Sequence, residues 1–348
     1  MGMTALSNAW PTLVDISRRM DPDGKLAKVS EILNKYNEVL DDLPFVEGNL
    51  PTGHKTTVRA SLPTPTWRLL NRGVVPVKST TNQIVETCGM LEAYSEIDKD
   101  LAMLNGNTAA WRLSEDTAVI EGMNQALTTA LIYGDTSANP EQFVGLAPRY
   151  YQVGSTASAI TSQNVIDAGG GTNSTSIYLV GWSTDTVHGI FPKGSVGGLN
   201  MQDLGEQTIY DGQSFPGAGR YQAYRTHYQW KVGLCIRDWR FVVRIANIGV
   251  TALETAGDTS DTSANIIKYM SQALDKLPPV GNVRPVFYMN QRVRAMLRVK
   301  MLSKSNAFIT LENLQGPSIT RPTLNFMGVP CRRVDGILNT EAQVTAST

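Results

Sequence analysis

The sequence predicts an α+β protein without the regular strand–helix–strand rhythm of a parallel sheet. The first observation is a single long, strongly periodic helix that ends near residue 134. The second is the extended, proline-containing stretch before it, and the third is the Gly/Ser/Thr-rich region with strands after it. A chain of 348 residues can bury a substantial core, which indicates two or three subdomains.

The composition excludes several classes of protein. The chain has 31 Lys plus Arg and 31 Asp plus Glu, so it lacks the basic excess of a dedicated nucleic-acid binder. No apolar run approaches the roughly 20 residues that span a bilayer, and the first residues do not resemble a secretory signal. We therefore expect no membrane association. The three cysteines, Cys88, Cys235 and Cys331, are far apart, which indicates reduced thiols rather than a disulfide framework.

Residues 1–20 predict an irregular arm, and a helix is expected from Lys25 to Leu43. Its apolar residues follow the spacing of a narrow seam: Leu26, Val29, Leu33, Tyr36, Leu40 and Leu43. Such a seam can pack on its own domain or on another subunit, and the sequence leaves both open.

Residues 47–90 predict extended structure, because their prolines exclude a helix and belong on edge strands or turns. Between Gly48 and Val85 there is no acidic residue, but there are five basic ones: Lys55, Arg59, Arg68, Arg72 and Lys78. A long hairpin with little core of its own is marginal in water. We expect it to lie on a neighbouring subunit, although a solvated hairpin is the usual alternative.

The next segment, Glu86–Glu121, reverses the charge with eight acids. A basic hairpin beside an acidic stretch can pair within one chain or between chains. The predicted inter-subunit residues are the five basic residues above together with Glu92, Glu96, Asp98 and Asp100.

The long helix is expected to begin at Ser114, a favourable N-cap residue. Its apolar stripe comprises Val119, Ile120, Met123, Leu127, Ala130 and Leu131. Gly134 suits the left-handed position after a helix, and Pro140 prevents the helix from resuming. By itself this pattern is that of an ordinary buried helix.

The rest of the chain alternates loops with short elements. We expect loops at 155–176 and 194–223, and a turn into a last strand from Gly328. Strands are expected at Ile177–Trp182, Val187–Phe191, 228–248 and Val286–Met289, and helices at Ser263–Leu277 and Gln291–Leu302.

No motif of catalysis or cofactor binding is present. The phosphate-binding and dinucleotide-binding glycine loops are missing, and the nearest match to a hydrolase nucleophile turn, at Ser195, has Lys193 in place of the first glycine. His54, His188 and His227 stand apart without metal-ligand spacing. We predict no catalytic, cofactor-binding or metal-binding residues and no enzymatic activity. A triad assembled only in space stays open, because triads are not recognised by sequence position.

Four phrases resemble the major capsid proteins of tailed bacteriophages, particularly short-tailed ones. They are GNLPTGHKTTVRASLP at 48–63, YGDTSANPEQFVGLAPRY at 133–150, SIYLVGWSTDTVHGIFPKGS at 176–195 and MGVPCRRVD at 327–335. The resemblance implies the Hong Kong 97-type capsid fold. Its parts would be an N-terminal arm (1–47), an extended-loop β-hairpin (48–100), a peripheral domain with a long spine helix (101–154), an axial domain (155–305) and a return to the peripheral domain (306–348).

The same resemblance implies a major capsid protein that assembles as pentamers and hexamers into an icosahedral shell around double-stranded DNA. Its partners would be copies of itself, a separate scaffolding protein, a portal, a cement or decoration protein, and packaged DNA held by weak nonspecific contact. It would be located in the virion after assembly in the cytoplasm of the bacterial host. Two alternatives remain: a shell of the same fold that encloses protein cargo, and a hydrolase-like enzyme.

Overall fold

The computed structural model describes residues 37–104, 108–154, 159–171, 173–210, 219–255, 265–279, 281–303, 309–313 and 322–345. The predicted arm and most of the predicted helix Lys25–Leu43 lie outside these residues. Only α2 (Val39–Asp42) is helical at the end of that segment. The helix prediction is wrong for Asn37 and Glu38, because their backbone pairs with the C-terminal strand: Asn37 bridges Val334, and the Glu38 N–H donates to the Arg333 carbonyl at 3.1 Å.

The described residues form two compact units. The first unit contains Met90–Leu127 and Val196–Lys231, and the second contains 37–89, Thr128–Ser195 and 232–345. Helix α4 (Thr108–Tyr133) and strand β9 (Arg220–Ile236) contribute residues to both units. None of the described helices is long and apolar enough to cross a membrane.

The core of the second unit is a mixed sheet. Strand β6 (Ser174–Trp182) lies antiparallel to β10 (Val242–Gly249) and to β11 (Arg284–Met289). The order continues from β11 through β14 (Val329–Arg333) and β13 (Pro322–Phe326) to β12 (Ile309–Asn313). On the other side, β10 pairs with β5 (Val165–Asp167). Every residue of β6 is buried, including the polar Ser174, Thr175 and Ser176 that precede its apolar run.

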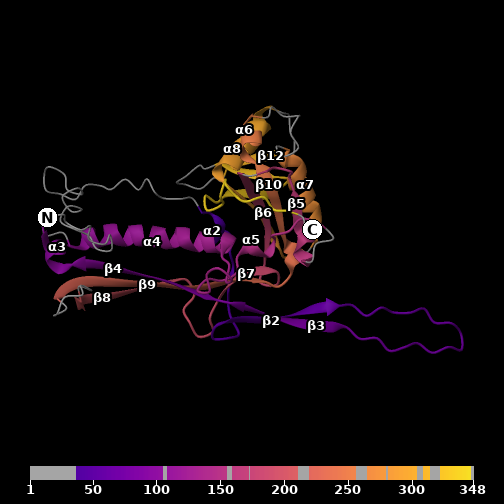
Figure 1. Cartoon of the computed structure of the whole chain (residues 1–348), viewed down its shortest axis with the longest axis horizontal. Coiled ribbons are helices and arrows are strands. Elements are labelled where there is room, and N and C mark those ends of the chain that lie inside the picture. Colours follow the sequence, from indigo (N-terminus) through magenta and orange to yellow (C-terminus); the bar gives the residue numbers. More distant parts are fainter. Residues whose placement is uncertain are drawn as a thin grey trace. The chain divides into compact units, whose positions relative to one another are not determined.

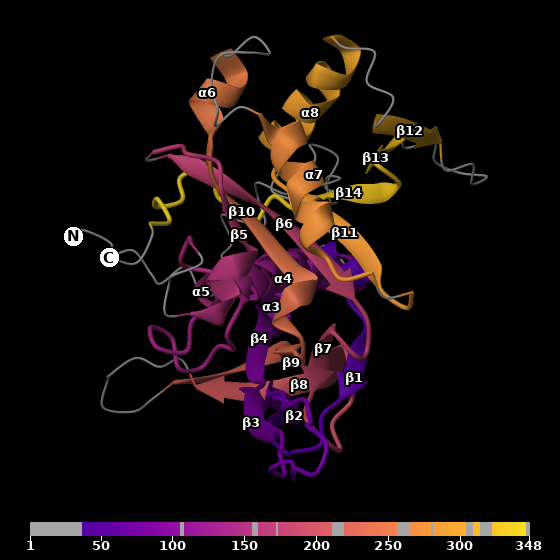
Figure 2. The same cartoon turned by 90° about the vertical axis from the view of Figure 1, so that its right-hand side faces the viewer.

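Helices cover this sheet. Residues of α7 (Ile266–Lys276) and α8 (Gln291–Ser303) join β6, β10 and β11 in one apolar cluster that includes Met270, Leu297, Leu179 and Phe287. Figure 2 shows both helices beside the sheet, with the short α6 (Val250–Thr255) nearby. The predictions of both helices, of the strands Ile177–Trp182 and Val286–Met289, and of a last strand after Gly328 are confirmed.

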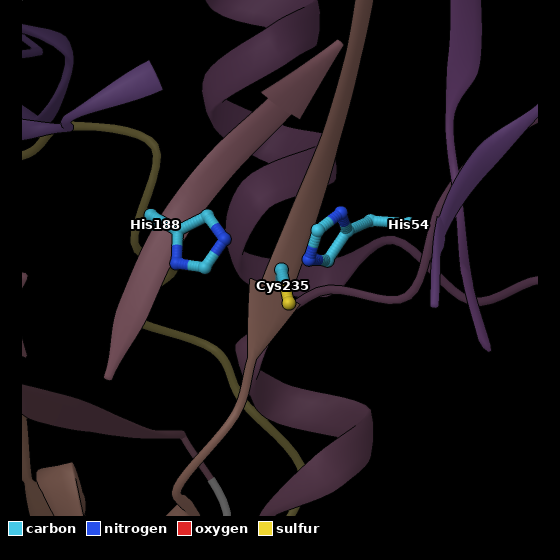
Figure 3. Close-up of side chains that lie close together, drawn as sticks. All are labelled: His54, His188 and Cys235. Atoms are coloured by element: carbon cyan, nitrogen blue, oxygen red, sulfur yellow. The ribbon is translucent and has the colours of Figure 1, made fainter. Parts of the chain in front are cut away.

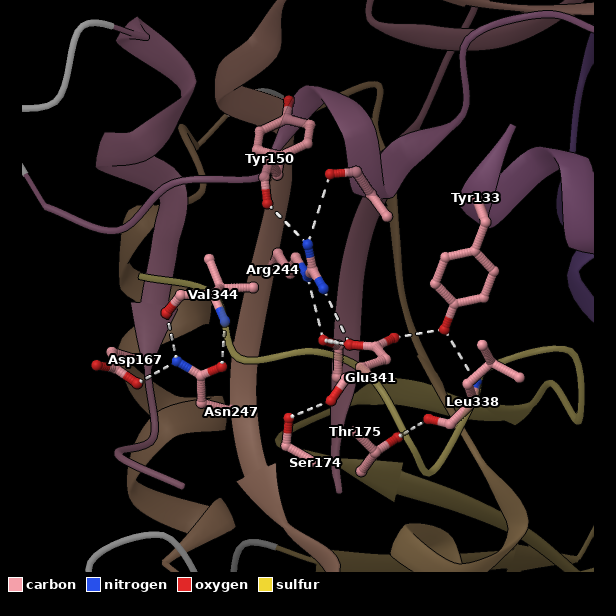
Figure 4. A network of polar contacts seen from close by, with 12 residues as sticks. Tyr133, Tyr150, Asp167, Ser174, Thr175, Arg244, Asn247, Leu338, Glu341 and Val344 are labelled. Carbon is pink, nitrogen blue, oxygen red and sulfur yellow. Dashed lines mark hydrogen bonds and ion pairs between the residues drawn. The ribbon is translucent and has the colours of Figure 1, made fainter. Parts of the chain in front are cut away.

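A buried polar network connects the C-terminal segment to the sheet (Figure 4). The Arg244 guanidinium of β10 contacts the Glu341 carboxylate at 2.9 Å, and both side chains are 5% exposed. Glu341 also accepts hydrogen bonds from the hydroxyls of Tyr133 and Ser176. Burial, reinforced by this carboxylate, raises the pKa of Tyr133 far above its ordinary value. This network thereby connects residues that are far apart in the sequence. No apolar pattern in the sequence would have predicted these contacts.

The extended hairpin is confirmed and belongs to the second unit. Strand β2 (Gly53–Ser61) pairs antiparallel with β3 (Thr80–Thr87), and residues 62–79 connect them as a long loop that reaches away from the sheet (Figure 1). A side chain at Gly53 would lie 2.0 Å from the Glu86 carbonyl, so close strand pairing requires glycine there. Among the strands that the structure describes, these two pair only with each other. Strand β1 (Phe45–Glu47) pairs in parallel with β7 (Val187–Phe191).

The first unit combines part of α4 with α3 (Lys99–Met103) and the strands β4 (Gly89–Asp98), β8 (Leu199–Tyr210) and β9. Its apolar cluster is small: Ile97, Ala102 and Trp111, with Leu101 and Tyr224 packed against them. Ion pairs supplement this cluster, including Arg112–Asp203 at 2.6 Å. In the described part of this unit, polar contacts between elements therefore add to the apolar burial.

Two local predictions about α4 are wrong. The helix begins at Thr108 rather than Ser114, because Trp111 is anchored in the cluster with Ile97 and extends the helix backward. Gly134 does end the helix, but it is not among the residues with positive φ. A side chain there would lie 2.4 Å from the Phe143 carbonyl, so close backbone approach is the reason for glycine. Of the predicted stripe, Met123, Leu127 and Leu131 are buried and Ile120 is exposed.

The predicted loop 194–223 is also wrong, because most of it forms β8 and the start of β9. The two strands pair from Leu199↔Trp230 to Tyr210↔Arg220. The ladder contains a register shift at Gly205, whose φ is +67°. Polar residues and glycines made this region resemble a loop, whereas pairing with β9 makes it a strand.

Candidate assembly surfaces

The loop at the end of the hairpin exposes large apolar side chains. Trp67, Leu70 and Leu69 are 103%, 90% and 74% exposed, respectively. Leu62, Val74, Val75 and Val77 are exposed as well. Exposed apolar groups clustered in this way mark a surface that contacts another molecule. The charges of this segment do not predict these apolar residues, but the runs Leu69-Leu70 and Val74-Val75 are a signal for them in the sequence.

The five predicted basic residues lie on the same hairpin. Lys55 and Arg59 are on β2, and Arg68, Arg72 and Lys78 are in the loop. All five side chains are exposed, and none forms an ion pair with another residue that the structure describes. The hairpin thus presents apolar and cationic groups together.

The predicted acidic residues lie in the first unit and are less available. Glu96 forms an ion pair with Arg225 at 2.8 Å, and Arg225 also lies over the Tyr94 ring at 4.1 Å. Glu92 contacts His227 at 3.3 Å. A hydrogen bond from Gln229 is the main cause that lowers the pKa of the Glu92 carboxyl.

The remaining two predicted acids start α3. The Asp98 carboxylate caps this helix by accepting the Asp100 N–H at 2.9 Å, and the Asp100 side chain is exposed. Within the described part of the chain, neither carboxylate has an ion-pair partner. Of the four predicted acids, these two are the ones that remain available for a partner in another chain.

Glu86, the first acid of the acidic segment, is buried in the second unit. Arg149 donates to its two carboxylate oxygens at 2.7 and 2.5 Å. This bidentate pair joins β3 to α5 (Leu146–Arg149) and connects the hairpin to the body of that unit.

A cleft of about 760 Å³ lies beside the hairpin in the second unit, and Val58, Ile84 and Trp239 are among its lining residues. Its lining contains no histidine or cysteine. The two carboxylates in the lining, Glu86 and Asp238, are each held by an arginine. Among the described residues that line this cleft, neither carboxylate is therefore free of an arginine partner.

Two of the three histidines, His54 and His188, lie close to each other and to a cysteine. Ligand atoms of His54, His188 and Cys235 all lie within 4.8 Å of one another (Figure 3). This cluster cannot be predicted from residue spacing, because its members are on three different strands.

Comparison with known proteins identifies the family. The family model described as Major capsid protein GP7 matches residues 21–345. The structure of bacteriophage Epsilon15 matches with 32% sequence identity and a TM-score of 0.76, covering 99% of this chain and 100% of that chain. The capsid of bacteriophage JBD30 matches at 8% identity and a TM-score of 0.45, with coverage of 89% and 95%. The latter score is too low to support an argument. The curated proteins contain no match.

The α+β Hong Kong 97-type fold is confirmed, and the family and structural matches together define a capsid shell protein of a bacteriophage. The chain belongs to the Major capsid protein GP7 family, as the match over 21–345 shows. It is therefore a structural protein of the virion that assembles with copies of itself into a shell.

Proposed function

We propose that this chain assembles as pentamers and hexamers into an icosahedral shell around double-stranded phage DNA, and that it has no enzymatic activity. The observation that carries the proposal is the hairpin loop, where apolar side chains such as Trp67 and Leu70 are left almost fully exposed. Covering such side chains on a neighbouring copy removes apolar area from water, which is favourable at about 25 cal/mol per Å².

The roles of the predicted segments follow from this proposal. Residues 1–47 act as the arm, 48–100 as the extended hairpin, 101–154 and 306–348 as the peripheral domain, and 155–305 as the axial domain. A separate scaffolding protein, a portal and a cement protein act as partners, and DNA is held by weak nonspecific contact. Assembly takes place in the cytoplasm of the bacterial host.

The assembly of the purified chain tests this proposal. The chain, with and without its scaffolding protein, should form closed shells that electron microscopy resolves as pentamers and hexamers. Particles isolated from infected cells should contain double-stranded DNA sensitive to nuclease after disruption. A chain that stays a folded monomer at high concentration in both conditions contradicts the proposal, and particles that contain only protein cargo contradict the role in DNA packaging.

The charged hairpin gives a second prediction. We propose that Arg59, Arg68 or Arg72 pairs with an acidic residue of another subunit, with Asp98 and Asp100 as the available acids. Arg68→Glu should reduce the yield of shells at least tenfold. It should shift Tm by no more than about 2 °C, because an exposed charge contributes little to the stability of one chain.

Arg68→Lys serves as the matched control, because it keeps the charge and should keep assembly close to normal. The reversal Asp100→Arg combined with Arg68→Glu should restore shells if these two residues pair. Equal losses of assembly and of chain stability in Arg68→Glu would instead indicate an ordinary contact within one subunit.

A further inference from the structure

His188 and Cys235 meet inside the sheet of the second unit. They are directly opposite each other on the antiparallel strands β7 and β9. His54 approaches from β2, with its ring 5.9 Å from the His188 ring and nearly perpendicular to it. In Figure 3 the three side chains point toward one common space. His188 is 1% exposed and Cys235 is fully buried.

The His188 side chain has an unusual environment. Neither of its ring nitrogens forms a hydrogen bond with any described residue. The Ser183 backbone lies near the ring but does not reach hydrogen-bond geometry. A buried imidazole without a partner loses the hydrogen bonds that water would provide, so such a group calls for an explanation. A bound ion at the common space would provide one.

The donor atoms restrict the kind of ion. Two imidazoles and one thiol contain no oxygen donor, which excludes Ca²⁺ and Mg²⁺ as preferred ions and suits Zn²⁺. Neighbouring ligand atoms around a tetrahedral Zn²⁺ are about 3.3–3.6 Å apart, from Zn–N and Zn–S bonds of about 2.0–2.3 Å. The present separations, all within 4.8 Å, need side-chain adjustments of only about 1 Å to reach this geometry.

The protonation of the ligands partly favours binding and partly opposes it. Burial, with the charges of His54 and Arg237, lowers the pKa of His188 to about 4, so the ring is neutral as a ligand must be. Burial raises the pKa of Cys235 to about 12, so the ion has to displace its proton. His54 Nδ1 accepts the Asn49 N–H at 3.3 Å, and binding through Nε2 would break this long contact. The free energy of one such hydrogen bond is small compared with that of a set of metal–ligand bonds.

We propose that His54, His188 and Cys235 bind one Zn²⁺ ion per chain, with water in the fourth position. The ion ties the base of the hairpin to the body of the second unit. This connection matters because β2 pairs only with β3 and has no ladder to β7 or β9. The site differs from the prediction that no residue of the chain ligates a metal, and it does not depend on the contents of the shell.

The test uses the full unassembled chain after treatment with a chelator. Added Zn²⁺ should bind at about one ion per chain after gel filtration, and it should raise Tm, because an ion that binds only the folded chain stabilises it. Mg²⁺ at the same concentration should do neither. Co²⁺ should produce the near-ultraviolet absorption of a sulfur–cobalt bond. Less than about 0.1 Zn²⁺ per chain at micromolar concentrations, or a cobalt complex without this absorption, overturns the proposal.

Variants locate the site. Cys235→Ser and His188→Gln should each weaken Zn²⁺ binding roughly 100-fold or more, and Cys235→Ser should abolish the sulfur–cobalt absorption. Cys331→Ser and His227→Gln are the matched controls and should bind like the original chain. Unchanged binding in Cys235→Ser overturns the assignment. If a variant does not fold by circular dichroism, the stoichiometry and cobalt spectrum of the original chain decide. Shell formation is measured separately by electron microscopy, so failure of zinc binding is distinct from failure of assembly.

Discussion

Replacing Glu341 by alanine should lower the free energy of unfolding by about 3–5 kcal/mol, the largest stability effect that we expect for a single side chain here. The Glu341 carboxylate is buried and lies 2.9 Å from the Arg244 guanidinium. Removing it leaves a buried cation without its counter-ion. The remaining acceptors of Arg244, such as the Tyr150 carbonyl at 2.9 Å, are neutral and compensate only in part.

Chemical denaturation monitored by circular dichroism would measure this loss. Glu254→Ala is the matched control, because Glu254 pairs with Arg292 at 3.6 Å on the surface, with side chains 42% and 59% exposed. An exposed pair contributes about 0–1 kcal/mol, so this control should remain close to the original stability. Glu341→Gln keeps the shape but removes the charge and should fall between the two. Similar small losses in Glu341→Ala and Glu254→Ala would show that the buried network does not hold the C-terminal segment.

Replacing Trp67, Leu69 and Leu70 together by serine should abolish shell formation and leave the stability of the single chain unchanged. All three side chains are already exposed in one chain, so their removal costs that chain almost nothing. In the proposed shell they are covered by a neighbour, where each large apolar side chain contributes about 1.5–3 kcal/mol. The triple variant loses this contribution to assembly at every subunit of the shell.

Light scattering and electron microscopy would measure assembly, and thermal melting would measure stability. The double variant Thr64→Ser and Thr66→Ser is a control in the same loop, because it changes exposed polar residues and leaves the apolar ones. It should assemble normally. Shells that form at the original rate from the triple serine variant would contradict the idea that the hairpin loop docks on a neighbour.

The elements that could be predicted from the sequence are those in which local pattern and burial agree. Strands β6 and β11 each contain an unbroken run of buried apolar residues, Ile177–Val180 and Val286–Met289, and β7 is short and mostly buried. Helix α7 has an amphipathic stripe that packs on the sheet. The hairpin is extended because Pro51 before β2 and the prolines within its loop, Pro63, Pro65 and Pro76, exclude a helix. In each case the signal lies within a few consecutive residues.

The missed features depend on residues far away in the sequence. The start of α4 is set by the packing of Trp111 with Ile97, and β8 is a strand because it pairs with β9. The basic side chains of the hairpin are exposed, as expected for charged residues. Only the structure shows that Glu92 and Glu96 already have partners on β9. The inter-subunit role of the basic residues stays a prediction.

The sequence by itself determined the α+β class, the extended basic hairpin and the resemblance to phage capsid proteins, because these follow from local periodicity, composition and short phrases. Only the tertiary structure decided which charges are already paired, that Glu341 is buried against Arg244, and that His54, His188 and Cys235 converge. Strand pairing and packing bring together residues that lie tens of positions apart, as the pair Arg244–Glu341 and the strand contact His188↔Cys235 show. A local sequence pattern carries no information about such contacts, because they form and contribute to stability only once the chain has folded.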